Sequence, residues 1–387
     1  MRSGQLETVI LELLLTDGQI TRKMVLEAFP TRPASLLAVI SDMTRRGIVH
    51  EPQRSGRNTG SRASVIELNP RAGLFIGLDL DITATTAVCV DTQGKILFQE
   101  RLPAAVPLDR SSAQAQVAAL IERLRKHLGA DWTLVRGIGF ADPGLVDTRR
   151  GISLKAVNLP GWEQIPTAEW LTKLTDRPVQ VIGAPIARAY GEYVSTSKSR
   201  PRSLVHVQLD EVIGAGFIED GRLFVGASGC AMEIGHVVVQ EDGPLCRCGN
   251  RGCLEAVAGI VGIRHRLTEM ARQRVISPLI REPFSIALWQ DCLRTGDKVA
   301  GNLRSEVGQS VGQAVASLTC ILNPDVIIFS GALTGLGGGL IEQIRQVLSQ
   351  HCLPQALEHL DLRVSTLGDT GTAWGGALIA RRQALIP

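Results

Sequence analysis

The chain has 387 residues, of which 44% are hydrophobic and 20% charged, and it holds 40 glycines. Its length exceeds one ordinary core, and its composition is typical of a globular α/β protein with many tight turns, which excludes a disordered or fibrous chain. The amino terminus lacks the features of a signal peptide and no apolar run is as long as a membrane span, so we expect a cytoplasmic protein without membrane contact.

Apolar spacing predicts three short helices in the first fifty residues. The first helix stops at Gly18, the second covers residues 22–29, and the third begins after a possible cap at Thr31 and ends at Gly47. Three short helices with tight connections make a helix-turn-helix unit.

A basic hairpin follows these helices. Residues 48–50 and 63–68 are predicted as two strands that flank a flexible turn, and together with the helices they indicate a winged helix-turn-helix over residues 1–71. Residues 1–73 hold ten Lys and Arg against seven Asp and Glu, whereas the other 314 residues hold 31 of each. This local basic excess favours DNA as the partner. The alternative is a protein-interaction module with a solvated basic face.

A helix-turn-helix offers the start of its third helix to the major groove, while arginines of the wing neutralise phosphates or enter a minor groove. The expected DNA contacts are Arg32, Ser35 and Ala38 on the recognition helix and Arg54, Arg57 and Arg62 on the wing.

From Leu74 onward the pattern changes to strands separated by glycine turns. Residues 74–80, 85–91, 95–102 and 134–140 are predicted as strands, and a helix is expected from about Ser111 to Leu128. This order indicates an α/β fold.

Eight cysteines occur in the chain, and three of them lie within residues 246–253. In a chain without an export signal, such a cluster favours a metal site over a disulfide framework.

Five segments of the large domain carry a family resemblance. They are ADPGLVD at 141–147, VNLPGW at 157–162, MEIGH at 232–236, CRCGNRGCLEAVAG at 246–259 and LNPDVIIFSGAL at 322–333. Together they resemble the ROK family, whose name joins repressors, uncharacterised reading frames and sugar kinases. The resemblance covers residues 72–387, and the repressor branch carries a helix-turn-helix in front.

The resemblance implies a two-lobed actin-like sugar-kinase fold, which is ribonuclease H-like. The first lobe is expected at residues 72–182 together with a final helix at 373–387, and the second lobe at 183–372 with a zinc loop at 236–255. Glycines that the chain retains, such as Gly139, either let the backbone approach a phosphate or are needed for the backbone geometry of the fold.

His236, Cys246, Cys248 and Cys253 make the closed tetrahedral set of a structural zinc ion, which leaves no open position for catalysis. The alternative is free buried cysteines beside an unrelated histidine.

Two segments depart from the family's kinases. Where the kinases resemble D-x-G-G-T at the phosphate loop, this chain has Asp79 to Thr83 with Asp81 and Ile82 in place of the glycines. Where the kinases have a segment like E-N-D-A-N-A-A-A, the position of the catalytic aspartate is Ala184. Losing a general base removes a factor of roughly 10²–10⁴ in rate. We therefore expect no kinase activity and assign no catalytic residue.

The resemblance carries over four positions that contact sugar: Asn158, Glu233, His236 and Glu255. Amide and carboxylate groups suit sugar hydroxyls because they form paired hydrogen bonds. The alternative is that Glu233 and Glu255 only orient the zinc loop.

The resulting hypothesis is a DNA-binding transcriptional regulator, expected to be a repressor, that senses a sugar or sugar derivative. Two-fold symmetry would match a homodimer or a dimer of dimers to a palindromic operator in double-stranded DNA. The alternatives are an ATP-dependent sugar kinase with an accessory N-terminal domain and a protein-binding scaffold built on an inactive kinase.

Overall fold

The computed structural model describes residues 2–52, 65–196 and 201–386. The chain separates into two compact units, residues 1–200 with 369–387 and residues 201–368. Within the described ranges, no helix combines the length and the apolar character needed to cross a membrane.

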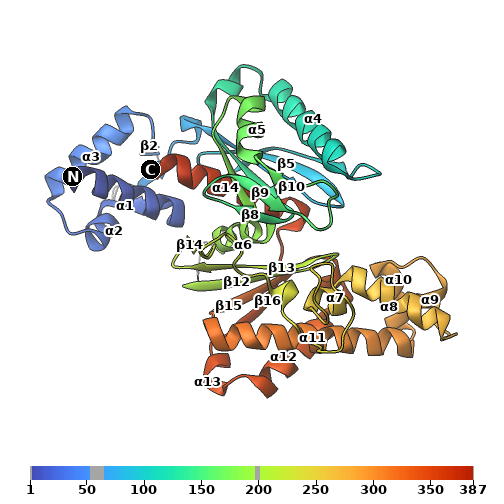
Figure 1. Ribbon diagram of the computed structural model, residues 1–387. Coiled ribbons are helices and arrows are strands. Elements are labelled where there is room, and N and C mark those ends of the chain that lie inside the picture. Colours follow the sequence, from blue (N-terminus) through green and yellow to red (C-terminus); the bar gives the residue numbers. More distant parts are fainter. Residues whose placement is uncertain (1, 53–64, 197–200, 387) are drawn as a thin grey trace. The chain divides into compact units, whose positions relative to one another are not determined.

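The first unit begins with a small group of helices and strands (Figure 1). In chain order they are α1 (Arg2–Asp17), β1 (Gln19–Thr21), α2 (Arg22–Ala28), α3 (Pro33–Arg45), β2 (Val49–His50) and β3 (Val65–Leu68). The strands form an antiparallel sheet in the order β1-β3-β2. The three helices agree with the sequence prediction, but β1 was missed because three residues are too few for a periodic signal.

The residues at the ends of these helices show which local sequence signals start and end them. Gly18 and Gly47 both have φ of +72°, the left-handed conformation that ends α1 and α3. The Thr21 hydroxyl accepts a hydrogen bond from the Met24 N–H and so caps α2. The expected cap of α3 at Thr31 is wrong: Arg32 is the N-cap and makes no side-chain cap bond. Pro33 starts this helix instead, because its ring presets φ and it lacks the N–H that a cap would satisfy.

The first unit continues with a five-stranded sheet in the order β11-β7-β4-β5-β6. The first three strands along the chain are antiparallel neighbours, whereas β7 and β11 join in parallel. The elements are β4 (Leu74–Leu80), β5 (Ala84–Asp91), β6 (Ile96–Pro103), α4 (Arg110–Leu128), β7 (Val135–Asp142), β8 (Leu145–Asp147), β9 (Ile152–Lys155), β10 (Glu163–Ile165), α5 (Thr167–Thr175), β11 (Val179–Gly183), α6 (Ala184–Ser195) and, after the second unit, α14 (Gly371–Leu385). Strands β8, β9 and β10 form a separate small sheet. The predicted strands and the helix α4 are confirmed.

Both faces of the large sheet are covered, since β4 and β5 are buried along their whole lengths. Ile76 and Leu78 of β4 pack with Leu120 of α4 on one face. Phe75 points to the other face and packs with Ala373 of α14. The alternation of side chains along a strand explains this division.

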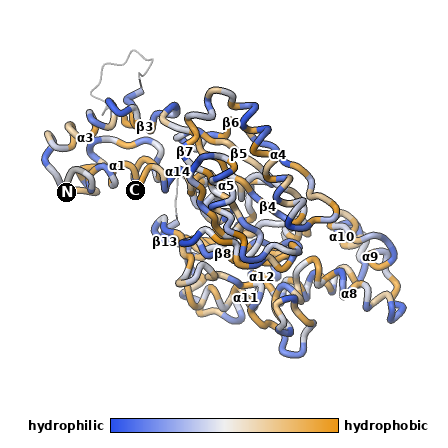
Figure 2. Tube along the Cα trace, turned by 45° about the horizontal axis from the view of Figure 1, so that its top comes forward, coloured by the Kyte–Doolittle hydropathy of each residue, from blue (hydrophilic) through white to orange (hydrophobic). Residues whose placement is uncertain are grey.

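Helix α14 connects the large sheet to the N-terminal helices within the first unit. Its last residue, Leu385, is buried in the same core as Leu6, Ile10 and Met43. Arg382 of α14 pairs with Glu12 of α1 at 3.3 Å. Figures 1 and 2 both place the end of α14 beside α1.

Helix α6 packs against α14 within the first unit, where Gly375 lies against the Ala187 backbone. The structure therefore groups α6 with the first compact unit, and the lobe boundary at residue 182 stays a prediction.

The second unit repeats the pattern of the first sheet, in the order β14-β13-β12-β15-β16. Again three antiparallel strands are followed by two parallel ones. The elements are β12 (Ser203–Leu209), β13 (Ile213–Glu219), β14 (Arg222–Leu223), α7 (Leu254–Ala258), α8 (Ile260–Arg272), α9 (Pro278–Arg281), α10 (Ile286–Arg294), α11 (Lys298–Leu322), β15 (Val326–Ser330), α12 (Gly338–His351), α13 (Pro354–Leu357) and β16 (Asp361–Val364). Its core lies between this sheet and the long helix α11.

Candidate metal, ligand and DNA sites

The second unit brings four predicted metal ligands together. The ligand atoms of His236, Cys246, Cys248 and Cys253 all lie within 4.8 Å of one another. The Cys246 Sγ lies 3.7 Å from the His236 Nδ1, and the Cys248 Sγ lies 3.7 Å from the Cys253 Sγ. A tetrahedral zinc ion with bonds near 2.3 Å requires ligand separations of about 3.8 Å. The two 3.7 Å separations match this value, so the group can hold a metal ion.

The backbone around these ligands is held by short-range contacts. His236 ends a single helical turn at Ile234–His236, and Cys253 is the N-cap of α7. The bridges Val238↔Cys253 and Leu245↔Arg251 close the loop between them.

Gly252 and Gly249 give this loop its tight turns. Gly252 has φ of +68°, and a Cβ there would lie 1.5 Å from the Gln240 carbonyl oxygen. Gly249 has φ of +99°. Both conformations favour glycine, because a side chain is strained in this region of φ.

The thiols of the cluster differ in their electrostatics. Burial and the two neighbouring thiols raise the pKa of Cys253 to about 12. A backbone hydrogen bond from Asn250 lowers the pKa of Cys248. A bound divalent cation would reverse the effect at Cys253, because metal ligation stabilises the thiolate.

Glu233 and Glu255 lie beside His236 in the second unit. All three are within electrostatic reach of one another. The Glu255 carboxylate accepts a hydrogen bond from the Ile213 N–H at 3.3 Å, and partial burial raises its pKa. Glu255 is therefore tied to strand β13, whereas Glu233 is exposed.

Asn158 belongs to the first unit and lies in a compact loop between β9 and β10. This loop is closed by backbone hydrogen bonds, including Ala156 N–H to the Trp162 carbonyl at 2.9 Å. The Asn158 Oδ1 is buried and has no hydrogen-bond partner among the residues that the structure describes. A buried acceptor of this kind calls for a donor.

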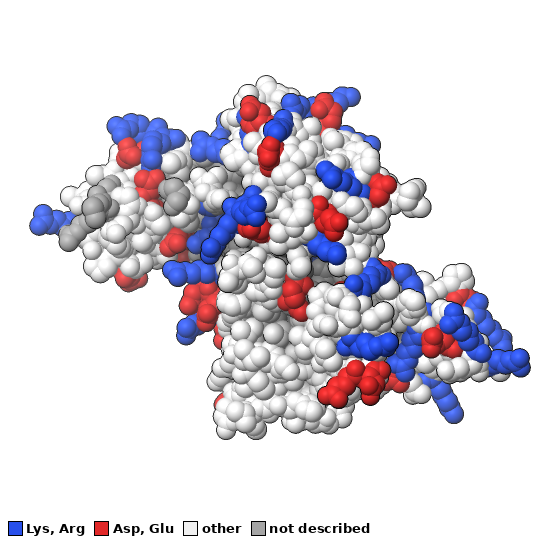
Figure 3. All heavy atoms as spheres, viewed as in Figure 1, with Lys and Arg blue, Asp and Glu red and all other residues white. Residues whose placement is uncertain are grey.

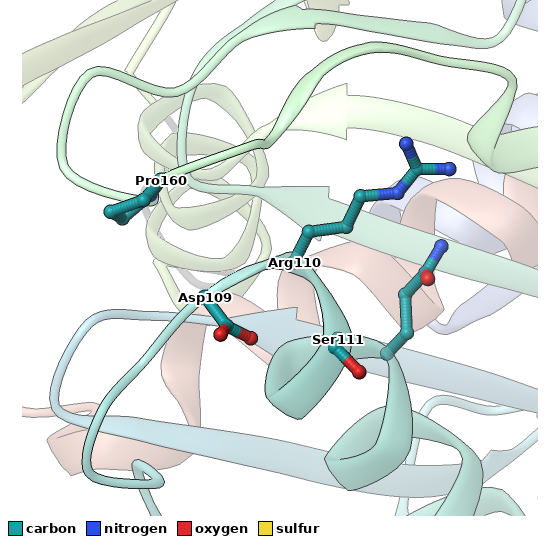
Figure 4. Close-up of a pocket in the computed structure, with 5 residues that line it drawn as sticks. Asp109, Arg110, Ser111 and Pro160 are labelled. Atoms are coloured by element: carbon teal, nitrogen blue, oxygen red, sulfur yellow. The ribbon is translucent and has the colours of Figure 1, made fainter.

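A shallow pocket lies next to this loop, at the start of α4 (Figure 4). It encloses about 350 Å³ and is lined by Asp109, Arg110, Ser111, Gln114 and Pro160. The Asp109 carboxylate is used in a capping box with Ser112, and the Arg110 N–H donates to the Pro160 carbonyl at 3.0 Å. These bonds join the loop to α4.

Asp142 was missed by the sequence analysis, although it holds the Asn158 loop in place. It is fully buried at the end of β7 and accepts hydrogen bonds from the Ser153 hydroxyl, the Trp162 Nε1–H at 3.0 Å and the Gly144 N–H at 2.9 Å. Burial raises its pKa, and these three donors oppose the rise. The alternation of β7 predicts an inward side chain here, but its partners come from three other segments.

Replacing Asp142 by Asn is expected to destabilise the first unit by about 1–3 kcal/mol. Both carboxylate oxygens accept hydrogen bonds, so either orientation of the amide places its NH₂ group against a donor. Thermal unfolding of D142N would show this loss. Asp147→Asn provides the control because this carboxylate is only partly buried and receives backbone N–H groups through one oxygen. Equal stability of D142N and the wild type would contradict the assigned network.

The two segments that are expected to depart from the kinases have clear local roles. The Asp81 carboxylate accepts hydrogen bonds from the Ile82 N–H at 2.7 Å and the Thr83 hydroxyl at 2.8 Å, and so organises its own loop. Burial and the charge of Asp81 raise the pKa of Asp79 well above its usual range. Ala184 is the first residue of α6, directly after the N-cap Gly183. Its methyl group cannot accept a proton.

The candidate DNA-contacting residues of α3 lie on its exposed side. Arg32, Ser35 and Ala38 are exposed, whereas Leu36 and Ile40 are buried. The wing residues Arg54, Arg57 and Arg62 lie outside the described residues.

The same side of α3 also exposes Ala34, Leu37 and Ser41, which the sequence analysis did not single out. Leu37 is 48% exposed, unusual for a leucine beside a core stripe. Lys and Arg atoms gather over the end of α3 (Figure 3), where Arg45 and Arg46 both pair with Asp42.

Two α/β units, each with a mixed five-stranded sheet, define a protein of the sugar-kinase-like class. The model of the ROK family matches residues 75–383. The chain therefore belongs to the ROK family.

Three known proteins place the chain within this family. It is 25% identical over 371 residues to a xylose repressor of Caldicellulosiruptor bescii, covering 95% of this chain and 93% of the relative. It is 28% identical over 317 residues to a glucokinase of Halalkalibacterium halodurans, covering 80% of this chain and 96% of the relative. The crystal structure of a ROK family transcriptional regulator, described as a homologue of Escherichia coli Mlc, has a TM-score of 0.83 at 25% identity and covers 100% of this chain and 96% of its own.

Proposed function

We propose that this protein is a sugar-responsive DNA-binding repressor. The observation that carries the proposal is the N-terminal group of three helices and a three-stranded sheet, which has the element order of a winged helix-turn-helix. Similarity to a xylose repressor over 95% of the chain supports it, whereas the glucokinase match leaves a fifth of the chain uncovered.

In this proposal residues 1–71 bind double-stranded DNA. Arg32, Ser35 and Ala38 enter the major groove, and Arg54, Arg57 and Arg62 contact phosphates or a minor groove. A homodimer or a dimer of dimers reads a palindromic operator because two such heads are related by two-fold symmetry.

The test is selection of genomic DNA fragments by the purified full-length protein, followed by titration of the recovered site. We expect a discrete palindrome and a loss of roughly fivefold or more in affinity for that site in R32A, because one base contact contributes about 1–3 kcal/mol. The triple variant R54A/R57A/R62A should weaken binding to all sequences and lower the salt dependence of binding.

Lys23→Ala is the matched control, since Lys23 is an exposed cation on α2 that faces Glu27. It should leave the operator affinity near the wild-type value. Binding that is independent of sequence, or that is equally weakened by K23A and R32A, would contradict the assignment of α3 as the recognition helix.

We infer that the protein senses a sugar or sugar derivative, with Asn158 as the candidate contact of the first unit and Glu233, His236 and Glu255 as the candidate contacts of the second. The unpartnered Asn158 Oδ1 supports a ligand with a hydroxyl donor. Thermal shift titrations with D-xylose and D-glucose, on the wild type and on N158A, test this role. A shift of equal size in N158A would remove Asn158 from the site.

The metal in this proposal is a structural zinc ion held by His236, Cys246, Cys248 and Cys253. Zinc fits because all four ligands come from the protein, so the ion stabilises the loop and has no open coordination position.

We infer that the protein is not an enzyme, because Ala184 stands at the position of the kinase base and Asp81 at that of a phosphate-loop glycine. The second candidate function is an ATP-dependent sugar kinase, favoured by the glucokinase match and by the retained Asp79. ATP consumption that depends on added glucose, and that is lost in D79A, would establish the kinase instead.

A further inference from the structure

Two cysteines outside the metal cluster meet at one corner of the second unit. Cys320 lies in the last turn of α11, and Cys352 directly follows α12. The Cys320 thiol is directed to the His351 carbonyl oxygen at 3.9 Å, and the Cys352 thiol to the Ala316 carbonyl oxygen at 3.6 Å.

These two contacts place each sulfur against the backbone next to the other cysteine. His351 is the residue before Cys352, so the Cys320 sulfur lies against the backbone that carries Cys352. Ala316 is four residues before Cys320, and in an α-helix its carbonyl pairs with the Cys320 N–H. The Cys352 sulfur therefore lies against the turn that carries Cys320. A neighbouring Cys320 thiol, together with burial, raises the pKa of Cys352 to about 11.

The two thiols differ in their access to solvent. Cys320 is exposed, whereas Cys352 is only 9% exposed. The residues that follow them, Ile321 and Leu353, are 77% and 70% exposed, so this corner of the unit is open to small molecules. An exposed cysteine next to a second, sheltered one is the arrangement of a reactive thiol with a resolving partner.

We propose that Cys320 and Cys352 form an oxidation site that takes a hydroperoxide and closes to a disulfide between α11 and the end of α12. This inference is independent of the proposed DNA and sugar functions.

The chemistry balances in two steps. The Cys320 thiolate attacks one oxygen of hydrogen peroxide, the O–O bond breaks, and Cys320 becomes a sulfenic acid while one water is released. The Cys352 sulfur then attacks the Cys320 sulfur, the S–O bond breaks, and a second water leaves as the S–S bond forms. The two thiols supply the two electrons that reduce the peroxide.

The disulfide would enclose residues 320–352, which include β15 and α12. Strand β15 lies between β12 and β16 in the sheet. Closing this segment restricts the unfolded chain, so the oxidised second unit should unfold at a higher temperature, by roughly 5 °C or more.

The test treats the full-length, zinc-loaded protein with graded hydrogen peroxide, blocks the remaining thiols by alkylation and maps peptides by mass spectrometry. We expect a peptide pair joined through Cys320 and Cys352, lighter by two hydrogens than its free parts and separated by dithiothreitol. C320S should give no joined pair and leave Cys352 unmodified. In C352S, Cys320 should accumulate as sulfenic acid at low peroxide and oxidise further to sulfinic acid at high peroxide.

Oxidation of the metal cluster is followed separately through zinc release, which the double variant C320S/C352S should leave unchanged. Three outcomes would overturn the proposal: no joined pair at peroxide levels that already release zinc, sulfinic acid on Cys320 of the wild type without a joined pair, or a Cys320 bridge between two chains. Cys320 is exposed, so C320S provides a decisive result even where C352S folds poorly.

Discussion

Removal of the metal from the His236 cluster is expected to unfold its loop and to lower the thermal stability of the second unit strongly. The cause is the absence of a core within the loop: between residues 237 and 252, only Gly243, Cys246 and Gly252 are buried. Backbone hydrogen bonds and two isolated bridges connect parts of the loop, so a bound metal would supply most of the free energy that orders it. Structural zinc contributes on the order of 10 kcal/mol at neutral pH.

The measurement combines metal analysis with thermal unfolding. We expect one zinc ion per chain, a marked fall in the unfolding temperature with a chelator, and recovery when zinc is added back. C253S should unfold at the lower temperature even without a chelator, because Cys253 is a completely buried member of the cluster. C230S is the control, since Cys230 lies outside the cluster. A protein that contains no metal and unfolds at the same temperature in C253S would contradict the zinc proposal.

Gly77→Ala is expected to destabilise the first unit by about 3 kcal/mol or more. A Cβ at Gly77 would lie 1.7 Å from the Ala373 carbonyl oxygen and 2.8 Å from the Ala377 backbone nitrogen. Both atoms belong to the backbone of α14, so no side-chain rotation relieves the clash. The helix must move away from β4, and α14 also carries Leu385 into the N-terminal core.

Two measurements separate this clash from the effect that a glycine-to-alanine change has on stability at an open position. Thermal unfolding of G77A should begin at a temperature lower by roughly 6 °C or more. Gly301→Ala is the matched control: Gly301 lies inside α11 with nothing within 4 Å of its Cβ position, so alanine should stabilise the helix by up to about 1 kcal/mol. If G77A and G301A shift the unfolding temperature in the same direction, the close packing of α14 on β4 does not determine the stability of the first unit.

The same packing answers the question that the sequence left open at Gly139. A Cβ there would lie 2.0 Å from the Gly376 carbonyl oxygen, again on α14. The glycine is therefore required by the approach of a helix to the sheet, whether or not a phosphate binds nearby.

The sequence by itself determined the features that depend on neighbouring residues. Hydrophobic spacing predicted the three N-terminal helices, the strands from Leu74 onward and helix α4, because periodicity reports which face of an element is buried. Composition and spacing predicted His236, Cys246, Cys248 and Cys253 as a metal set, since ligand chemistry restricts the residue types that can serve, and the structure brings the four together. Comparison of motifs predicts departures from the kinases at Asp81 and Ala184.

Only the tertiary structure decided the features that depend on distant residues. The partners of Asp142 come from three segments, and strand β1 exists because it pairs with β3 across more than forty residues of chain. Leu385 reaches the core that contains Leu6, and the Cys320 thiol lies against the His351 carbonyl oxygen, one residue before Cys352. Such contacts form when packing brings remote segments together, and their free energy depends on distances that no local pattern encodes.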